Sequence, residues 1–596
     1  MSKRRLSPGR QPLPKRLHND HSPTATHPTS RTSFDQLWDE IILVIFSYLS
    51  HRDLCRVQAT SQNWSRLALD NQLWKKLYLG EYGRARLRGG RGFVGRHDGR
   101  EIKPLPERAK THPEASNDGR DWKWMFRISS NWRTGRCAVE QWKPWLTPSS
   151  TTPEVSAEHH TCVLLAGSLI IASSTTNGQP SLSLISPNQG KHILSCKTRR
   201  SNATTNINCI ILDQSHPLNT HTIRLVAFLS TSEFLIFSID HHHPTHSTLL
   251  SSYLPTIRMP RLTNIFHAAF HENLLVTLSH SFHVSIYDLS SGNIVHTQTL
   301  SSFSSYPPSS LVLTPLPPTH ASPLLLPRPS ASSSTSTYKL IITYAVPIYP
   351  AHWSVGATEL IISSELSGMT VTSTRTVRAF DVPTGWLDVN KMAAMKAQWG
   401  RKVRQVADTQ SDGKWVVLAP GEDSPGLNQE YTDENGGNVR ADVADTERMS
   451  IHSSASMHSM TSLQLYRLSF PTSPISAATS PSSTSQPKLT FVRMLHGHIG
   501  PVSALSIADG RCVSLGVNGS IWVWDLEGGE NASIGKEAYQ SGSEESVEVR
   551  KADQDEREEQ EEDIGVLVVA KGAVVFDERR IVSAGRNGVE VRRFDV

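Results

Sequence analysis

The chain has 596 residues, with 60 Lys and Arg against 55 Asp and Glu, which leaves a formal charge of +5 at pH 7. A chain of this length is expected to fold as more than one domain, and so mild a charge does not by itself indicate nucleic-acid binding. The six cysteines include no Cys-x-x-Cys pair, which favours free thiols over a disulfide framework or a zinc site.

Residues 1–33 are rich in Pro, Ser, Thr, His and Arg and are expected to form a disordered, basic tail. The tail lacks the apolar stretch of a secretion signal, and no window of the sequence has the ~20 apolar residues that span a bilayer. We therefore expect a protein of the cytoplasm or nucleus, with no membrane contact. Lys3-Arg4-Arg5 with Lys15-Arg16 is either a split nuclear-import signal or only part of the tail.

Residues 34–80 are predicted to be helical, and the first helix, placed at 37–49, contains the apolar run Ile41–Phe46. At ~100° per residue, one apolar stripe of this helix consists of Leu37, Ile41, Ile45 and Leu49. Ile42 and Phe46 lie beside this stripe. A module of about 45 residues can cover one side of such a helix but not both. The open side is therefore either packed against the rest of the chain or a partner-binding surface.

Polar residues mark the starts of the following helices. Ser50-His51-Arg52-Asp53 fits a capping box, which predicts that a second helix starts after it and favours a helix over a buried strand for the preceding run. Asp70 or Asn71 is a suitable N-cap for a further helix that carries Leu73, Trp74 and Leu77.

The rest of the chain has a different texture. Residues 81–157 are predicted to be a linker with a helical segment near 121–132. In residues 158–596, short apolar or β-branched runs alternate with clusters of Ser, Asn, Gly and Pro, which is typical of an all-β domain. Four polar segments are predicted to be disordered insertions, near 301–337, 421–460, 471–488 and 529–563.

An internal repeat indicates the architecture of this β region. Residues 491–526 contain Gly497-His498, an Asn518-Gly519 turn and Trp524-Asp525, and residues 565–596 repeat the pattern with Asn587-Gly588 and Phe594-Asp595. About seven such units are predicted, near 158–190, 205–240, 261–296, 309–383, 390–468, 490–528 and 564–596.

The repeat resembles a WD-repeat β-propeller, in which four-stranded blades surround an axis. In such a fold Trp522 and Trp524 are expected in the core between blades, while His498 and Asp525 form structural hydrogen bonds. The ring is expected to close by pairing of its terminal strands.

The helical segment resembles an F-box. The match runs without gaps from Leu37 to Leu77, through Glu40, Ile41, Ile45, Ser47-Tyr48-Leu49, Asp53-Leu54, Trp64 and Leu73-Trp74-Lys75-Lys76. Trp38 stands where the family usually has Pro, which preorganises a first helical turn, and Thr60-Ser61 replaces the usual Val-Cys. Residues 122–137 are similar to the segment that joins an F-box to the propeller in F-box/WD proteins, at Trp122, Phe126, Arg127, Asn131-Trp132 and Gly135.

F-box/WD proteins are substrate receptors of SCF-type (cullin-RING) ubiquitin ligases. The resemblance implies that the F-box docks a Skp-family adaptor, and through it a cullin, while the propeller binds a protein substrate for ubiquitination and proteasomal degradation. The adaptor-binding residues that it implies are Leu37, Ile41, Ile45, Leu49, Leu54, Trp64 and Trp74. Of these, Leu37, Ile41 and Ile45 are expected to be direct contacts, and some of the others core.

The substrate site is not identified from the sequence. Some F-box/WD receptors bind phosphorylated motifs through arginines, but Arg375, Arg378, Arg511 and Arg586 are assigned no such role because their side chains cannot be placed. No catalytic residue, cofactor, metal or nucleic-acid partner is predicted: GxxxxGK[ST], HExxH and GxSxG motifs are absent, and the histidines of "DHHHPTH" (240–246) lack the spacing of metal ligands. Two other hypotheses stay open, a non-ligase interaction scaffold and a propeller enzyme.

Overall fold

The computed structural model describes residues 37–82, 121–142 and 161–595, except for 168, 177–178, 187–189, 199–204, 216–221, 241–242, 256–263, 317–335, 349–351, 366–367, 381–384, 387, 422–461, 472–485, 499, 509, 528–545, 552–571 and 586–587. Backbone contacts divide the chain after Leu77 into two compact units. The basic tail, residues 83–120, Arg586 and Asn587 lie outside the described residues.

The first unit is helical. It contains α1 (Asp39–Phe46), α2 (His51–Val57), α3 (Gln62–Ala68) and the first turns of α4 (Asn71–Tyr82). The Ser50 hydroxyl accepts from the Asp53 N–H at 3.3 Å, and the Asp70 carboxylate accepts from the Gln72 N–H at 2.8 Å. The predicted starts of α2 and α4 are thus confirmed, and Ser61 caps α3 in the same way. α1 is shorter than predicted, because the chain turns at Ser47.

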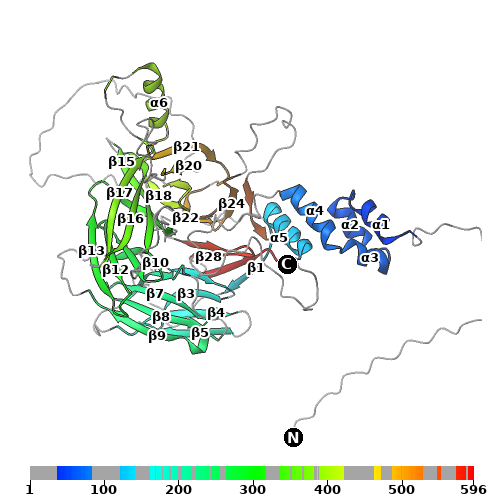
Figure 1. Cartoon of the computed structure of the whole chain (residues 1–596), viewed down its shortest axis with the longest axis horizontal. Coiled ribbons are helices and arrows are strands. Elements are labelled where there is room, and N and C mark those ends of the chain that lie inside the picture. The colour runs from blue at the N-terminus through cyan, green and yellow to red at the C-terminus, as the bar shows by residue number, and fades with distance from the viewer. Residues whose placement is uncertain are drawn as a thin grey trace, which may run out of the picture. The chain divides into compact units, whose positions relative to one another are not determined.

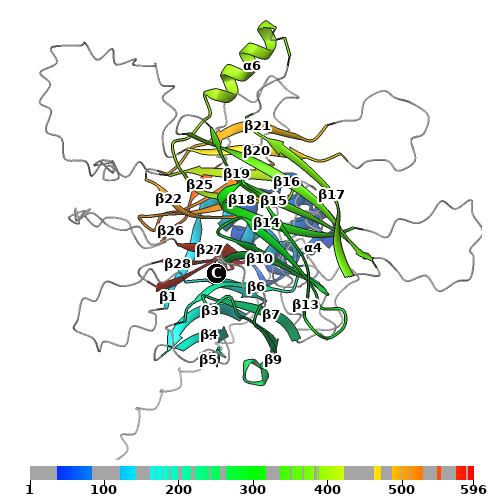
Figure 2. The ribbon, with the colours of Figure 1, turned by 90° about the vertical axis from the view of Figure 1, so that its left-hand side faces the viewer.

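The second unit contains a seven-bladed β-propeller, which confirms the predicted fold (Figures 1 and 2). The first three blades are β2 (Val163–Ala166), β3 (Leu169–Thr176), β4 (Gln179–Ser186) and β5 (Gly190–Ser195); β6 (Ile207–Leu212), β7 (Thr222–Leu229), β8 (Phe234–Asp240) and β9 (Thr248–Tyr253); and β10 (Ile265–His271), β11 (Leu274–Ser279), β12 (His283–Asp288) and β13 (Val295–Ser301). A short 3-10 turn, η3 (Pro244–His246), precedes β9.

The next three blades have the same antiparallel order. They are β14 (Tyr306–Leu316), β15 (Thr337–Ile348), β16 (His352–Glu365) and β17 (Gly368–Arg378); β18 (Val406–Ser411), β19 (Trp415–Pro420), β20 (Leu463–Ser469) and β21 (Lys488–Leu495); and β22 (Val502–Ala508), β23 (Arg511–Gly516), β24 (Ile521–Asp525) and β25 (Ser546–Glu548). Helix α6 (Val389–Trp399) joins the fourth blade to the fifth.

The seventh blade is completed by a strand from far upstream. β27 (Ala573–Phe576), β28 (Arg580–Gly585) and β29 (Gly588–Arg593) are followed in the sheet by β1 (Arg136–Trp142), which is antiparallel to β29 from Ala138↔Arg593 to Trp142↔Val589. The short β26 (Arg550–Lys551) pairs with β1 on its other side. Helix α5 (Trp122–Thr134) leads directly into β1.

Four predicted boundaries are corrected by these strands. Residues 136–142 are a propeller strand, not linker. β14 lies in the segment 301–337, and β25 and β26 lie in 529–563, where we expected insertions. Pro-rich β14 is tolerated because it is an edge strand of its blade, where the N–H groups that point away from the single neighbouring strand make no ladder bond. β21, at the start of our clearest repeat unit, belongs to the blade before.

The core lies between adjacent blades, where each sheet buries one face against the next. The packing of blade five on blade six places Trp415 and Trp524 in one buried cluster, with Trp522 partly buried beside it. Trp524 is 1% exposed, which confirms its predicted place between blades. Gly497 is required there, because a Cβ on this residue would lie 2.5 Å from the Trp522 ring.

Candidate functional site

Helix α1 has one buried edge and one exposed face. Ile42 and Phe46 are buried, and the Phe46 ring meets the Trp64 ring edge-on at 5.6 Å between centroids. Asp39, in the first turn, pairs with Arg66 of α3. These contacts attach α1 to α3 along a single edge, so the rest of its apolar surface stays open within the helical unit.

The exposed face of α1 carries large apolar side chains, which we call the α1 strip: Trp38 (76% exposed), Ile41 (47%), Val44 (58%), Ile45 (43%) and Tyr48 (82%). Scattered exposed apolar residues are ordinary, but a contiguous group of this kind on one helix is typical of a protein–protein interface. At the end of the strip, the Lys76 ammonium lies 5.4 Å from the centre of the Tyr48 ring and 3.3 Å from the Ser47 hydroxyl.

The structure divides the seven residues that the F-box resemblance implied. Ile41 and Ile45 are exposed on the α1 strip, and Leu37 and Leu49 are half-buried beside it. Leu54 and Trp74 are buried in the core of the helical unit, where the Trp74 indole donates to the Ala68 carbonyl at 2.8 Å. Trp64 is half-buried against Phe46.

Three residues of the strip were not among those predictions. Val44 and Tyr48 follow Ile41 at helical spacing, so the same wheel that grouped Ile41 with Ile45 could have included them. Trp38, which departs from the family pattern, occupies the N-cap position without making a side-chain cap. Its indole adds the second most exposed side chain of the strip.

The segment that resembles an F-box/WD linker forms α5, which packs on the last blade; we call α5, with Gly135 at its end, the clasp. The Asp121 carboxylate caps α5 by accepting from the Trp124 N–H at 3.0 Å, and Gly135 ends the helix at φ 70°, a conformation that favours glycine. Trp132 stacks on Phe594 at 4.0 Å, and its indole N–H donates to the Glu578 carbonyl at 2.9 Å. These contacts explain why Trp132 and Gly135 belong to the pattern.

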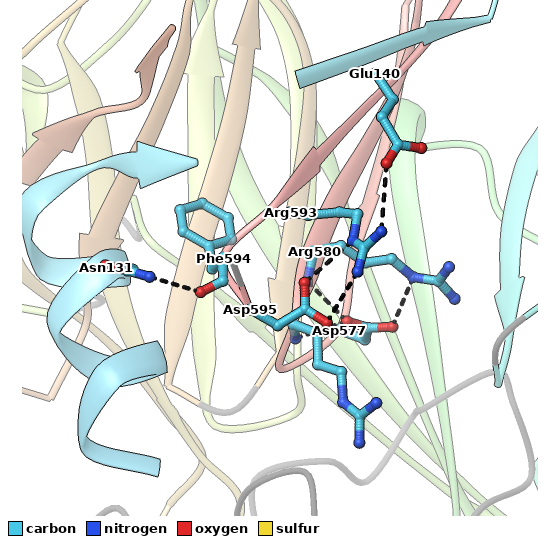
Figure 3. Close-up of polar contacts among 8 residues, drawn as sticks. Asn131, Glu140, Asp577, Arg580, Arg593, Phe594 and Asp595 are labelled. Atoms are coloured by element: carbon cyan, nitrogen blue, oxygen red, sulfur yellow. Dashed lines mark hydrogen bonds and ion pairs between the residues drawn. The ribbon is translucent and has the colours of Figure 1, made fainter. Parts of the chain in front are cut away.

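Polar contacts surround the same clasp (Figure 3). The Asn131 amide donates to the Phe594 carbonyl at 2.8 Å, which joins α5 to the end of the last strand. The Arg593 guanidinium lies between Glu140 of β1, at 3.3 Å, and Asp595, at 3.1 Å. Hydrogen bonding to Asp595 raises the pKa of Arg593 above its usual value, so the group stays charged. The clasp therefore closes the ring by both apolar and ionic contacts.

The arginines that lacked an assignment have structural partners. Arg375 binds the buried carboxylate of Glu359 and donates to the Pro471 carbonyl at 2.8 Å. Arg511 is buried, with its guanidinium 4.8 Å from the centre of the Trp132 ring. Arg378 is exposed and donates to the Ser304 hydroxyl at 3.3 Å. Of these three, Arg378 is exposed, Arg375 is half-buried and Arg511 is buried.

Among the propeller groups with shifted pKa values, His498 and Cys196 are buried. His498 contacts the Ser514 hydroxyl, and burial lowers its pKa to about 4, so the imidazole is neutral at pH 7. All six cysteines are free, and burial raises the pKa of Cys196 to about 12. Asp525 accepts from the Glu527 N–H at 3.1 Å within its own blade.

The described residues contain neither a cluster of metal ligands nor a membrane-spanning helix. In that part of the chain no three His, Cys, Asp or Glu side chains are arranged to hold a metal ion; the rings of His243 and His246 lie 5.5 Å apart, and residues 241–242 are not described. Among the helices of the described ranges, none is long and apolar enough to cross a membrane.

Comparison with known proteins gives two family matches. The F-box-like family matches residues 34–80, and the family described as "F-box protein pof12 beta-propeller" matches residues 160–592, which is more than half of the chain.

Individual relatives cover less. The F-box/LRR-repeat protein 5 of Pongo abelii is 33% identical over 91 residues, 15% of this chain and 12% of that protein. That of Bos taurus is 32% identical over 108 residues, 18% of this chain and 15% of that protein. The chain thus spans only a small fraction of the length of these relatives.

Among solved structures, the designed protein Ika8 is similar over 74% of this chain and 98% of its own, with 10% identity and a TM-score of 0.32. Sqt1 of Saccharomyces cerevisiae covers 72% of this chain and 92% of its own, with 9% identity and a TM-score of 0.31. These scores are too low to support an argument.

Proposed function

The chain belongs to the F-box protein pof12 beta-propeller family, and from that premise we propose that it is the substrate-recognition subunit of an SCF-type ubiquitin ligase. The F-box docks a Skp-family adaptor and through it a cullin, and the propeller binds the protein that is to be ubiquitinated. The chain carries out no chemistry itself. It raises the effective concentration of the substrate beside the conjugating enzyme, as tethering of two binding modules does.

The observation that carries this proposal is the α1 strip. It presents five large apolar side chains on one side of a helix whose other edge is buried against Trp64. Burying an Ile side chain completely contributes ~1.5–3 kcal/mol, and Ile41 and Ile45 are each a little under half exposed. Each can therefore contribute about 1 kcal/mol to a complex. An adaptor with a complementary apolar groove would obtain several such contributions from one helix.

The proposal is tested by placing charges on the strip. Ile41→Asp with Ile45→Asp removes about 2 kcal/mol of apolar contact and buries two carboxylates without partners, which costs several kcal/mol more. We expect at least a 1,000-fold loss of affinity for a purified Skp-family adaptor, with the circular dichroism of the propeller unchanged. The control is Leu69→Asp, which places a single carboxylate on an exposed apolar residue after α3.

Adaptor binding that survives the double substitution would contradict the proposal, and so would an equal loss in the Leu69→Asp control. An adaptor that binds without a co-purifying cullin favours the second candidate function, a propeller scaffold that acts outside the ligase. A propeller can bind a partner protein in either function, so co-purification of a cullin is the observation that distinguishes the two.

A further inference from the structure

Helix α6 stands off the rim of the propeller, between the fourth and fifth blades (Figures 1 and 2). It has 11 residues and none of them is buried. Its start is capped by Asp388, whose carboxylate accepts from the Lys391 N–H at 2.7 Å. Its end is anchored by Trp399, whose ring lies 5.6 Å from the ring of Phe380. An isolated helix of this length is marginal in water, so this helix contributes little to the stability of the propeller.

The side chains that α6 exposes are of two kinds. The apolar ones include Trp386 just before the helix (88% exposed), Val389 (84%) and Met392 (42%). The cations are Lys391 and Lys396 on the helix, which are exposed, and Lys402 after it, which is half-buried with its ammonium 4.1 Å from the centre of the Trp399 ring. We call these residues, with Trp399, the α6 surface. Within the described part of the chain, no carboxylate pairs with its three lysines.

The α6 surface continues onto one end of the fourth blade. The backbone of Val403, just after α6, pairs with Trp353 at the start of β16. The strand registers place Tyr306, at the start of β14, and Arg378, at the end of β17, at this same end. Tyr306 meets the Trp353 ring edge-on at 5.5 Å, and Phe303 in the preceding loop is 91% exposed. Aromatic and cationic groups thus share one edge of the propeller.

This edge has a positive potential. Residues 386–402 contain four cations, at positions 391, 396, 401 and 402, and one carboxylate, which caps the helix. The pKa of the neighbouring His352 is lowered from its usual value, first by burial and then by the positive charges of Lys402 and Arg404. An acidic ligand would be attracted here from a distance and would neutralise the lysines on binding.

We propose that the α6 surface docks an acidic peptide segment of a partner protein, in which carboxylates alternate with aromatic or aliphatic side chains. The carboxylates pair with Lys391, Lys396 and Lys402, and the apolar side chains cover Trp386 and Met392. The proposed docking site deepens the proposed function. It rests on that function in one respect, that the partner is the substrate recruited for ubiquitination.

The arrangement of the surface favours such a peptide over other anionic partners. On a helical wheel Lys396 lies between Val389 and Met392, so α6 lacks the separate apolar face with which a helix enters a bilayer. Lys391 and Lys396 are five residues apart, about 7.5 Å along the helix axis. Lysines spaced in this way suit several carboxylates, whereas a single phosphate is usually held by converging arginines.

The test measures binding of a labelled peptide, in which Asp and Glu alternate with Phe and Leu, to the full chain. Fluorescence anisotropy is recorded at low salt. We expect Lys391→Glu with Lys396→Glu to weaken binding about 10- to 100-fold. Trp386→Ser should weaken it less, and raising the salt should weaken it in the wild type. The matched control, Lys197→Glu with Lys488→Glu, reverses two exposed lysines elsewhere on the ring and should bind like the wild type.

An equal loss in the control pair would overturn the proposal, because it would indicate attraction by net charge alone. Binding that appears only after deletion of residues 553–563 would show that the acidic segment of this chain is the occupant, and would overturn it too. Vesicles of phosphatidylserine and phosphatidylcholine that bind in place of the peptide would assign the surface to a membrane. Adaptor co-purification is scored on the same samples, so its loss with peptide binding intact counts against the proposed function alone.

Discussion

Replacing Trp132 by Ala tests whether the clasp on the last blade holds the propeller closed. Trp132 is 3% exposed, stacks on Phe594 at 4.0 Å, and donates its indole N–H to the Glu578 carbonyl at 2.9 Å. Truncation of a buried Trp costs ~3–5 kcal/mol. Within that sum, the lost stacking contributes ~0.5–1.5 kcal/mol and the orphaned carbonyl ~1–3 kcal/mol. We expect the free energy of unfolding of the propeller to fall by about 4 kcal/mol.

The assay is urea unfolding of the full chain, followed by the circular dichroism of the β-sheets. Trp132→Phe helps to separate the two contributions, because it keeps an aromatic ring beside Phe594 while it loses the N–H donor and part of the ring volume; its expected cost is ~1–3 kcal/mol. Trp386→Ala is the matched control, since that side chain is 88% exposed and its loss should change stability by less than ~0.5 kcal/mol. If Trp132→Ala costs less than ~1 kcal/mol, the clasp does not hold the ring and the reasoning is wrong.

Two more predictions concern stability. Phe46→Ala should destabilise the helical unit by ~3–5 kcal/mol, because Phe46 is 3% exposed against Trp64; unchanged thermal unfolding of the helices would refute this attachment of α1. The pKa of His498 is about 4 in the folded chain, below its unfolded value of ~6.5. The neutral imidazole therefore contributes fully to the free energy of unfolding above pH ~6.5. This contribution is lost as the pH falls towards ~4, at up to ~1.4 kcal/mol per pH unit. His498→Asn should flatten that slope between pH ~4 and ~6.5, and urea midpoints with the wild-type slope would contradict the assignment.

Part of the candidate site was predictable because it depends on residues near one another in the chain. The caps at Ser50 and Asp70 are three-residue signals, and each defined the start of a helix correctly. The helical wheel placed Ile41 and Ile45 on one stripe, and the structure leaves both exposed. The helical wheel did not predict that Leu54 and Trp74 are buried in the helical unit. An apolar residue has the same appearance in a sequence whether residues of its own chain or a partner cover it.

The sequence by itself determined the helical character of residues 34–80, the all-β character of most of the remaining chain and a repeat of about seven units, since hydrophobic period, caps and Asn-Gly turns act over a few residues. Only the tertiary structure decided which edge of α1 is buried, because that depends on the contact of Phe46 with Trp64 in another helix. It also decided that residues 136–142 complete the last blade: Ala138 pairs with Arg593, more than 400 residues away, and no local pattern encodes such a partner. The isolation of α6 on the rim is decided in the same way, by what the folded blades leave uncovered.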